Sequence, residues 1–194
     1  MPVAAIILAA GESRRLGQPK QLLTYRGETL LVRAIRLANE AGASPVLVVL
    51  GANFATILTT VQSSNSIPVH NDRWRQGIAS SIVVGVRVLS VCGSEAEGVL
   101  LMGCDQPRLT ADHLRSLIAA FEGQAAEAIA ASSYAGVQAV PAVFPRAAFV
   151  ELRALGGDKG ARSVIESAQC RVVAMEFSGG EVDIDSAQDL ALLE

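Results

Sequence analysis

Short apolar runs alternate with amphipathic segments along most of the chain. Apolar runs at 3–8, 46–50, 67–69 and 98–103 predict strands, and helical spacing predicts helices near 29–41, 53–61, 78–90 and 111–121. Strands that alternate with helices in this way favour a mostly parallel sheet with helices on both faces. The pattern therefore predicts an α/β protein built as a three-layer α/β/α sandwich.

The alternation changes after residue 122. Apolar segments at 127–131 and 140–144 are followed by predicted helices at 145–154 and 160–167, a strand at 171–176 and a final helix from near Ser186. Ser186 and Asp189 have capping-box spacing at the start of that helix. Because no repeat, low-complexity tract or linker interrupts the chain, we expect a single domain over residues 1–194, with the second half laid as a layer onto the sheet begun by the first.

The first apolar run ends in a glycine-containing, basic segment. Aliphatic residues fill positions 3–10, and Gly11-Glu12-Ser13-Arg14-Arg15-Leu16-Gly17-Gln18-Pro19-Lys20 follows. A buried parallel strand delivers the next loop to the carboxyl edge of the sheet, where ligands of open α/β folds bind. Glycine lets backbone N–H groups face a ligand, and three cationic side chains add positive charge. We favour a polyanion site over an ordinary turn with solvated charges.

Spacing excludes two common phosphate-binding loops. Five residues lie between Gly11 and Gly17, and Gln18-Pro19 intervenes before Lys20, whereas the P-loop has a shorter spacing and its lysine directly follows the second glycine. A dinucleotide-binding fingerprint requires three closely spaced glycines, and only Gly11 lies near the end of the strand. The segment therefore represents a different kind of anion-binding loop.

Two further segments supply carboxylates for a cation. The apolar run at 98–103 delivers Asp105 to the sheet edge, and Pro107 keeps the preceding residue out of helical conformation. In Val182-Asp183-Ile184-Asp185-Ser186, strand alternation places both aspartates on one face. Carboxylates beside bound phosphates suit Mg²⁺, and we favour Asp105 and Asp185 as its ligands.

Each candidate segment also has a structural interpretation. Asp105 could cap the turn before Pro107, although Thr110 is better placed to cap the next helix. Asp185 could neutralise the dipole of the final helix, and residue types alone leave that alternative open. The segment from Asn71 to Ile82 suits contacts to a base or ribose, but its tryptophan is more typical of packing.

Composition narrows the class of protein. The chain has 194 residues, of which 51% are hydrophobic, so it can bury a sizeable core. A formal net charge of −3 argues against a nucleic-acid-binding surface, and positive charge matters where it clusters, at 14–20. The first residues lack a cationic leader, and no apolar run reaches the roughly 18 residues of a membrane span. We expect a cytoplasmic protein without a nucleic-acid or membrane partner.

Cysteine and histidine point to no metal or disulfide framework. Cys92, Cys104 and Cys170 are odd in number and widely spaced, and His70 and His113 have no Cys or His partner at metal-ligand spacing. We expect reduced, mostly buried thiols and no histidine-based metal chemistry.

Five segments, in this order, resemble motifs of the molybdenum cofactor nucleotidyltransferase family, within the glycosyltransferase-A-like nucleotidyltransferases. They are Leu8–Lys20, Asn71–Ser81, Cys104–Pro107, Gly157–Arg162 and Val182–Ser186. The likeness covers essentially the whole chain and is greatest to the molybdenum cofactor cytidylyltransferases. Two residues differ from the family pattern: Leu16 replaces a usual methionine, and Ala139 replaces a glycine before Val140-Pro141.

The resemblance implies a Rossmann-like nucleotidyltransferase fold and a magnesium-dependent reaction. A nucleoside monophosphate would pass from a nucleoside triphosphate to the phosphate of molybdopterin or molybdenum cofactor, with release of pyrophosphate. Residues 1–105 would mainly bind the nucleotide, and residues 106–194 would mainly bind the acceptor. A recipient molybdoenzyme or its chaperone is a further expected partner.

The resemblance also assigns roles to residues. The catalytic residues would be Arg15, Lys20 and Asp105, and the magnesium ligands would be Asp105 and Asp185. Nucleotide contacts would come from Leu8, Ala9, Ala10, Gly11, Arg15, Lys20, Gly77, Ser80 and Ser81. Acceptor contacts would come from Gln106, Pro107, Asp158, Lys159, Gly160 and Arg162.

Base choice is predicted from one methyl group. Guanylyl-transferring relatives usually carry glycine where this chain has Ala10, and the added methyl beside the base favours CTP over a bulky purine nucleotide. The alternatives are GTP or ATP as the donor, a sugar phosphate as the acceptor, and a non-catalytic molybdopterin carrier or chaperone. The segment at Gly157–Arg162 argues against the sugar-phosphate reaction, and retention of Arg15, Lys20 and Asp105 argues against a pure carrier.

Overall fold

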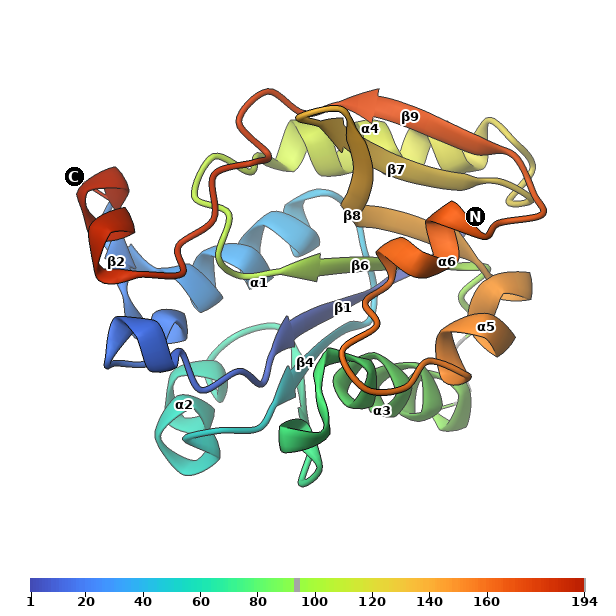
Figure 1. Ribbon diagram of the computed structural model, residues 1–194. Helices are drawn as coiled ribbons and strands as arrows, with labels where there is room; N and C mark the ends of the chain where they lie inside the picture. Colours follow the sequence, from blue (N-terminus) through green and yellow to red (C-terminus); the bar gives the residue numbers. More distant parts are fainter. Residues whose placement is uncertain (93–94, 194) are drawn as a thin grey trace.

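The computed structural model describes residues 1–92 and 95–193, and its main sheet lies between two layers of helices (Figure 1). The seven-stranded sheet has the order β5-β4-β1-β6-β8-β7-β9. Its strands are β1 (Val3–Ala9), β4 (Val46–Leu50), β5 (Ile67–His70), β6 (Gly98–Gly103), β7 (Ile129–Tyr134), β8 (Val137–Pro145) and β9 (Val172–Glu176). The α-helices are α1 (Leu30–Glu40), α2 (Phe54–Val61), α3 (Ile78–Val91), α4 (Ala111–Glu122), α5 (Phe149–Arg153) and α6 (Arg162–Glu166).

Strand direction places several loops at one edge of the sheet. β1 pairs in parallel with β4 and β6, and β4 pairs in parallel with β5. β8 runs antiparallel to both of its neighbours, β6 and β7, whereas β7 and β9 are parallel. The carboxyl ends of β1, β4 and β6 therefore meet at the same edge, and the loops that follow them share one region.

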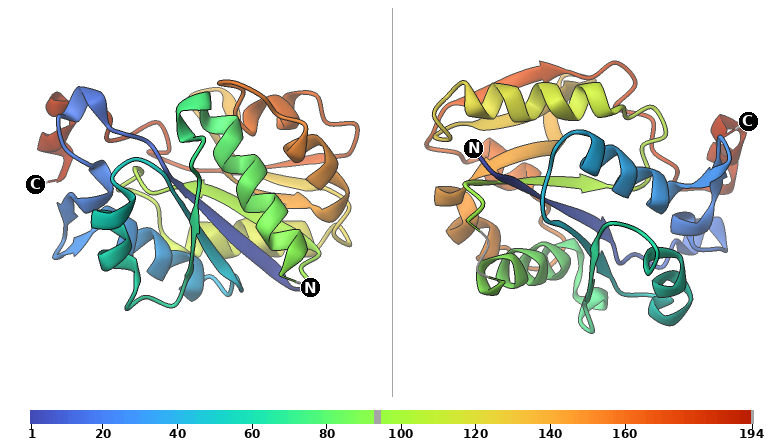
Figure 2. Two further views of the ribbon diagram at one scale, coloured as in Figure 1. Left: turned by 90° about the horizontal axis from the view of Figure 1, so that it is seen from below. Right: turned by 180° about the vertical axis from the view of Figure 1, so that it is seen from behind.

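The alternation of side chains along β1 explains the two helical layers. Val3, Ala5 and Ile7 pack in one cluster with apolar residues of α1, α2 and α4. Ala4 and Ile6 face the opposite way and pack with α3, α5 and α6. A strand that is apolar on both faces must be covered on both faces. The predicted three-layer α/β/α sandwich is confirmed, and Figure 2 shows the helices on either side of the sheet.

The second half of the chain differs from the prediction. Instead of lying as a layer on the first half, β7, β8 and β9 extend the same sheet beyond β6. The predicted helix at 145–154 divides into a 3-10 turn, Arg146–Ala148, and the short α5. The predicted final helix is a 3-10 segment, Ala187–Leu193. A hairpin of two short strands, β2 (Thr24–Tyr25) and β3 (Glu28–Thr29), had not been predicted.

The hydrogen bonds that cap the helix starts agree with the sequence prediction more closely than the second half of the fold does. Thr110 accepts a hydrogen bond from the backbone N–H of His113 at the start of α4. Asp189 accepts from both the N–H and the hydroxyl of Ser186, at 2.7 and 2.9 Å, as one half of a capping box does. The expectation for the cysteines was wrong in part: all three are free thiols, but only Cys104 is buried.

None of the helices in the described part of the chain is both long and apolar enough to cross a bilayer.

One glycine in β6 makes room for a core aromatic ring. A Cβ added at Gly98 would lie 2.6 Å from the ring of Phe121, which is fully buried. Gly98→Ala should lower the free energy of unfolding by about 1–3 kcal/mol, because the ring has no space to retreat. Chemical denaturation measures the effect. In a Phe121→Leu background the same change should cost less, and an equal cost in both backgrounds would show that the ring is not responsible.

Candidate functional site

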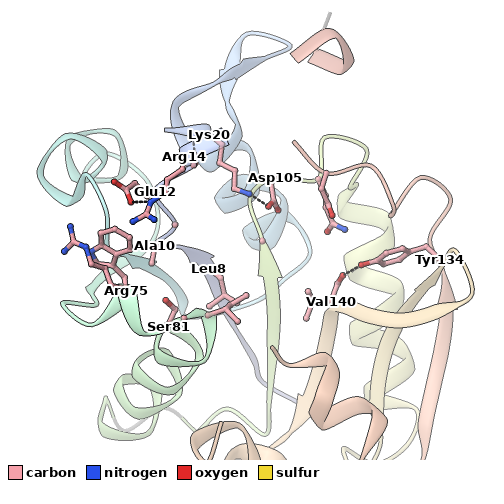
Figure 3. Close-up of a pocket in the computed structure, with 18 residues that line it drawn as sticks. Leu8, Ala10, Glu12, Arg14, Lys20, Arg75, Ser81, Asp105, Tyr134 and Val140 are labelled. Carbon is pink, nitrogen blue, oxygen red and sulfur yellow. Dashed lines mark hydrogen bonds and ion pairs between the residues drawn. The ribbon is translucent and has the colours of Figure 1, made fainter. Parts of the chain in front are cut away.

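A cleft of about 730 Å³ opens at the carboxyl edge of the sheet, over the ends of β1 and β6 (Figure 3). Five parts of the chain form its walls: the loop after β1, the start of α3, the loop after β6 and two segments from the second half. The lining residues are Leu8, Ala10, Gly11, Glu12, Ser13, Arg14, Lys20, Trp74, Arg75, Gly77, Ile78, Ser81, Gly103, Asp105, Gln106, Tyr134, Val140 and Asp183.

The loop after β1 is anchored on its inner side. It forms a 3-10 turn, Arg14–Leu16, between Ser13 and Gly17, which both have left-handed backbone conformations. Leu16 is buried in a small cluster with Leu30 and Ile184. The basic side chains of the turn remain on the outside: Arg14 forms an ion pair with Glu12 at 2.7 Å at the cleft wall. The loop thus has a fixed backbone and exposed cationic groups.

Lys20 is the electrostatic centre of the cleft. Its Nζ donates to Asp105 Oδ2 at 2.6 Å and to Asp185 Oδ1 at 2.7 Å, and only 18% of its side chain is exposed. Burial opposes its charge, but the two carboxylates outweigh burial and raise the pKa of Lys20 above its ordinary value. The ammonium group therefore stays protonated at neutral pH. Its hydrogen bond and charge hold the pKa of Asp185 below the usual range.

The two carboxylates fit a divalent cation. Because one ammonium nitrogen contacts an oxygen of Asp105 and an oxygen of Asp185, both oxygens point to a common position. Mg²⁺ beside phosphates typically takes one or two protein carboxylates and completes its coordination with phosphate oxygens and water. Arg15 contacts the other oxygen of Asp185 at 3.1 Å, and this pair is largely exposed. The donor set is thus suited to a cation that is shared with a phosphorylated ligand.

The segment that carries Asp183 and Asp185 is held against the loop after β6. Residues 182–185 form no strand, contrary to the expected alternation. Ile184 is fully buried between the two aspartates, and its N–H donates to the carbonyl of Asp105 at 2.9 Å. Asp183 therefore reaches the cleft, where partial burial and then the charges of Asp105 and Asp185 raise its pKa to about 6.

The far wall of the cleft comes from the second half of the chain. The side-chain amide of Gln106 donates to the carbonyl of Gly180 at 2.8 Å. The Tyr134 hydroxyl donates to the carbonyl of Val140 at 3.0 Å, across the hairpin of β7 and β8 (Figure 3). These contacts leave an aromatic face, an amide and a carboxylate opposite the basic loop.

The start of α3 is joined to the loop that contains Gly157. Gly77 has a φ of 98°, and a Cβ at this position would lie 2.3 Å from the carbonyl oxygen of Gly157. The N–H of Ala79 donates to the same oxygen at 3.2 Å. Only glycine permits this approach. Nearby, the buried amide of Asn71 donates to the hydroxyls of Ser80 and Ser81 at 2.9 and 3.0 Å.

The structure brings many of the predicted nucleotide-binding residues to the cleft. Those that line it are Leu8, Ala10, Gly11, Lys20, Gly77 and Ser81. Three others lie elsewhere: Ala9 is in the core, Ser80 donates to the carbonyl of Gly77, and Arg15 is exposed at the outer side of Asp185. The roles given to all of them stay predictions.

Fewer of the predicted acceptor residues lie in the cleft. Gln106 lines it, whereas Pro107 is buried behind it. Asp158, Lys159, Gly160 and Arg162 form an exposed loop and helix start outside the lining, and Arg162 pairs with Glu166 at 2.7 Å. Arg162 is nevertheless near enough to Tyr134 for its charge to oppose the effect of burial, which raises the pKa of that phenol.

Sequence reasoning did not identify several lining residues. Trp74 is a wall of the cleft, with the Arg75 guanidinium 4.3 Å from its ring centre. Tyr134 precedes an Ala-Gly turn at the end of an apolar run, and such a hairpin signal was available in the sequence. Asp183 was considered as a cation ligand, but Asp185 was preferred. Gln21 does not line the cleft and is buried beneath the loop after β1, and the sequence analysis did not consider it.

Comparison with known proteins places this geometry in a family. Residues 5–172 match the family model for the MobA-like NTP transferase domain. The chain is 32% identical to the purine catabolism protein PucB of Bacillus subtilis, over 95% of this chain and 92% of PucB. It is 28% identical to a protein named nicotine blue oxidoreductase from Paenarthrobacter nicotinovorans, over 97% and 94% of the two chains. A probable molybdenum cofactor guanylyltransferase of Opitutus terrae is 53% identical over 24% of this chain and 23% of that protein.

Solved structures agree with this assignment. Rv0371c of Mycobacterium tuberculosis superposes with a TM-score of 0.83 and 32% identity, over 100% of this chain and 97% of that chain. A structure of Rv0371c in complex with manganese gives a TM-score of 0.74 and 29% identity, with coverage of 100% and 98%. The chain therefore belongs to the MobA-like NTP transferase family and is a nucleotidyltransferase of that family.

Proposed function

We propose that this protein transfers a nucleoside monophosphate, preferably CMP from CTP, to the terminal phosphate of molybdopterin or molybdenum cofactor, with Mg²⁺, in the cytoplasm. The observation that carries the proposal is the convergence of Lys20, Asp105 and Asp185 beside a loop that carries positive charge. A polyanion and a divalent cation are the partners that such a cluster suits best.

The donor nucleotide fits between two parts of the cleft wall. Its base and ribose would contact the backbone from Leu8 to Gly11 and the segment from Gly77 to Ser81, including Ser80 behind it. Its phosphates would extend toward Arg15 and Lys20. The base would then lie at the apolar end of the cleft, where the wall is mostly backbone. The triphosphate would lie at the cationic end.

The reaction requires little covalent participation by the protein. An oxygen of the acceptor phosphate attacks the α-phosphorus, and the bond from the α-phosphorus to the bridging oxygen of the β-phosphate breaks, so that pyrophosphate leaves. The acceptor phosphate is already ionised near neutral pH and needs no general base. Lys20 and Arg15 orient and neutralise the phosphates, which supplies most of the catalysis in phosphoryl-transfer sites. Bound Mg²⁺, held by Asp105 and Asp185, would add Lewis-acid stabilisation of the α-phosphate.

The acceptor lies toward the second half of the chain. Gln106 provides an amide on that side of the cleft, and Pro107 fixes the turn that presents it. The exposed loop of Asp158, Lys159 and Gly160, with Arg162, supplies amides and cationic groups at the outer rim for the anionic part of a pterin substrate. Delivery of the product to a recipient molybdoenzyme, or to its chaperone, would use the same open rim.

Other donors, another acceptor and a non-catalytic role are the alternatives. A relative that matches over 47 residues is named a probable molybdenum cofactor guanylyltransferase, so GTP is the main competing donor. ATP stays a further alternative donor. A sugar-phosphate acceptor is less well supported, because the segment from Gly157 to Arg162 resembles the molybdenum cofactor group. A non-catalytic carrier has no need of the cluster formed by Lys20, Asp105 and Asp185. Incubation with CTP, GTP, ATP or UTP, together with molybdopterin and MgCl₂, followed by identification of any dinucleotide, separates these possibilities.

Asp105→Asn should reduce pyrophosphate release by at least ~100-fold while the protein remains folded, because several kcal/mol of charge stabilisation in the transition state are lost. Steady-state kinetics at saturating MgCl₂ measure the change. Asp112→Asn, which alters an exposed carboxylate on α4, is the matched control and should keep normal turnover. Near-normal turnover in Asp105→Asn would exclude Asp105 as a principal ligand.

Lys20→Met should reveal the cation site through stability alone. Without its ammonium group, Asp105 and Asp185 repel each other, and the free energy of unfolding should fall by about 1–3 kcal/mol in metal-free buffer. Added MgCl₂ should then raise the Tm of the variant more than that of the wild type, because the cation takes the place of the ammonium. Lys159→Met, which removes the other lysine, is the control. Equal magnesium-dependent shifts would contradict a site between the two carboxylates.

Ala10→Gly should improve the use of GTP relative to CTP. One methyl group in a pocket supplies only about 1–3 kcal/mol of discrimination, so the ratio of the two kcat/KM values should relax by roughly ten- to a hundredfold without a full switch. Both nucleotides are measured with the same acceptor. An unchanged ratio would assign selectivity to another part of the cleft, such as the segment from Gly77 to Ser81.

A further inference from the structure

Gln21 is one of the few fully buried polar side chains in the described part of the chain. It directly follows Lys20 in the 3-10 turn Lys20–Leu22, and only 1% of it is exposed. Lys20 points into the cleft, whereas Gln21 is absent from the residues that line it. Lys20 and Gln21 are thus neighbours in one turn but face opposite sides of the loop after β1.

The carboxamide of Gln21 holds that loop on either side of Ala10. Its Nε2 donates to the carbonyl oxygen of Ala9 at 2.7 Å and to that of Gly11 at 2.9 Å. The carbonyl of Ala10 itself accepts from the N–H of Ala52 at 3.0 Å. Three consecutive carbonyl oxygens are therefore bonded to donors of the protein, and acceptors that would repel phosphate oxygens are kept occupied.

The oxygen atom of the same carboxamide is placed unfavourably. Gln21 Oε1 is buried and has no hydrogen-bond partner among the described residues. An unsatisfied buried acceptor destabilises the fold, and an apolar side chain of similar size would avoid that cost. The reverse orientation of the amide would place Oε1 against two carbonyl oxygens, so the two donated bonds fix the orientation shown. Packing alone does not account for glutamine here, whereas the need for two donors does.

We infer that Gln21 is a positioning residue for the donor nucleotide: by holding the carbonyls of Ala9 and Gly11, it sets the backbone against which the base lies and the depth at which the Ala10 methyl enters the slot. The inference rests on the proposed function, because it assumes that a nucleoside triphosphate binds in this cleft. Gln21 touches no substrate and acts through the loop.

Gln21→Met tests the inference, because methionine has a similar length and no donors. Trp74, the sole tryptophan of the chain, lines the cleft and reports nucleotide binding by its fluorescence. We expect the Kd for CTP to rise about tenfold, corresponding to about 1.4 kcal/mol, with the ratio of the CTP and GTP dissociation constants moving toward one. The Tm should fall somewhat, because the carbonyls of Ala9 and Gly11 lose their donor although the unsatisfied acceptor of Gln21 is removed as well. Gln62→Met, at an exposed position, is the matched control.

The outcomes separate this inference from the function on which it rests. If the wild type binds no nucleotide, the proposed function fails. If the wild type binds and folded Gln21→Met binds with unchanged Kd and unchanged preference, the function stands and the positioning role is wrong. A lower Tm with normal nucleotide affinity would assign Gln21 a purely structural role.

A second variant applies if Gln21→Met does not fold. Gln21→Glu keeps the size of the side chain but sets a carboxylate against two carbonyl oxygens. Its Kd for CTP, relative to wild type at the same pH, should be raised at pH 8 and should recover toward pH 5, where the introduced carboxyl gains a proton to donate. A ratio near one at both pH values would overturn the inference.

Discussion

The charge balance around Lys20 is the interaction on which the geometry of the cleft depends. Its ammonium group joins Asp105, from the end of β6, to Asp185, from the last part of the chain. Both carboxylates lie within 2.7 Å of the Lys20 nitrogen. Without the positive charge between them, they would repel each other. The same position suits a divalent cation and lies beside the loop that carries Arg14 and Arg15. The stability of the cleft and its fit to a cation thus have the same electrostatic origin.

The sheet determines which segments can take part in that balance. Parallel pairing of β1 with β4 and β6 brings three carboxyl ends to one edge, and the loops of the first half gather there. The reversed strand β8 then lets the second half extend the sheet and present Tyr134 and Val140 across from the basic loop. A single continuous sheet therefore provides both walls, with the cationic groups on one side and an aromatic and amide surface on the other.

Periodicity in the sequence was sufficient to predict the three-layer sandwich, because β1, β4 and β6 are apolar on both faces and the helices carry clear apolar stripes. The hairpin of β2 and β3 was missed because strands of two residues have no detectable alternation. The proximity of Lys20 and Asp105 follows from strand ends that share an edge, and it was predictable for that reason. Asp185 reaches them from a segment that forms no strand, so strand alternation did not explain its place. Tyr134, Val140 and Asp183 depend on the order of strands in the second half, which local pattern does not determine.

Buried polar residues were the hardest to predict. Gln21 lies between a lysine and two leucines and has no distinguishing pattern in the sequence, yet its two donated bonds are visible at once in the structure. Asn71 opens a segment that the sequence singles out, but the bonds of its amide to two serine hydroxyls were not predicted. The partners of Gln21 and Asn71 lie 9 to 12 positions away, a spacing that matches no regular helix or strand contact, and only the fold brings them together.

The contact between Gly77 and Gly157 has a consequence for how this fold can diversify. The backbone at Gly77, before α3, and the loop that contains Gly157 touch at a point with no space for a side chain. A chimaera that takes the Gly157 loop from one relative and the start of α3 from another would combine surfaces that were shaped separately. The two segments therefore form one unit of exchange, and a change in this part of the fold is best acquired by replacing both together.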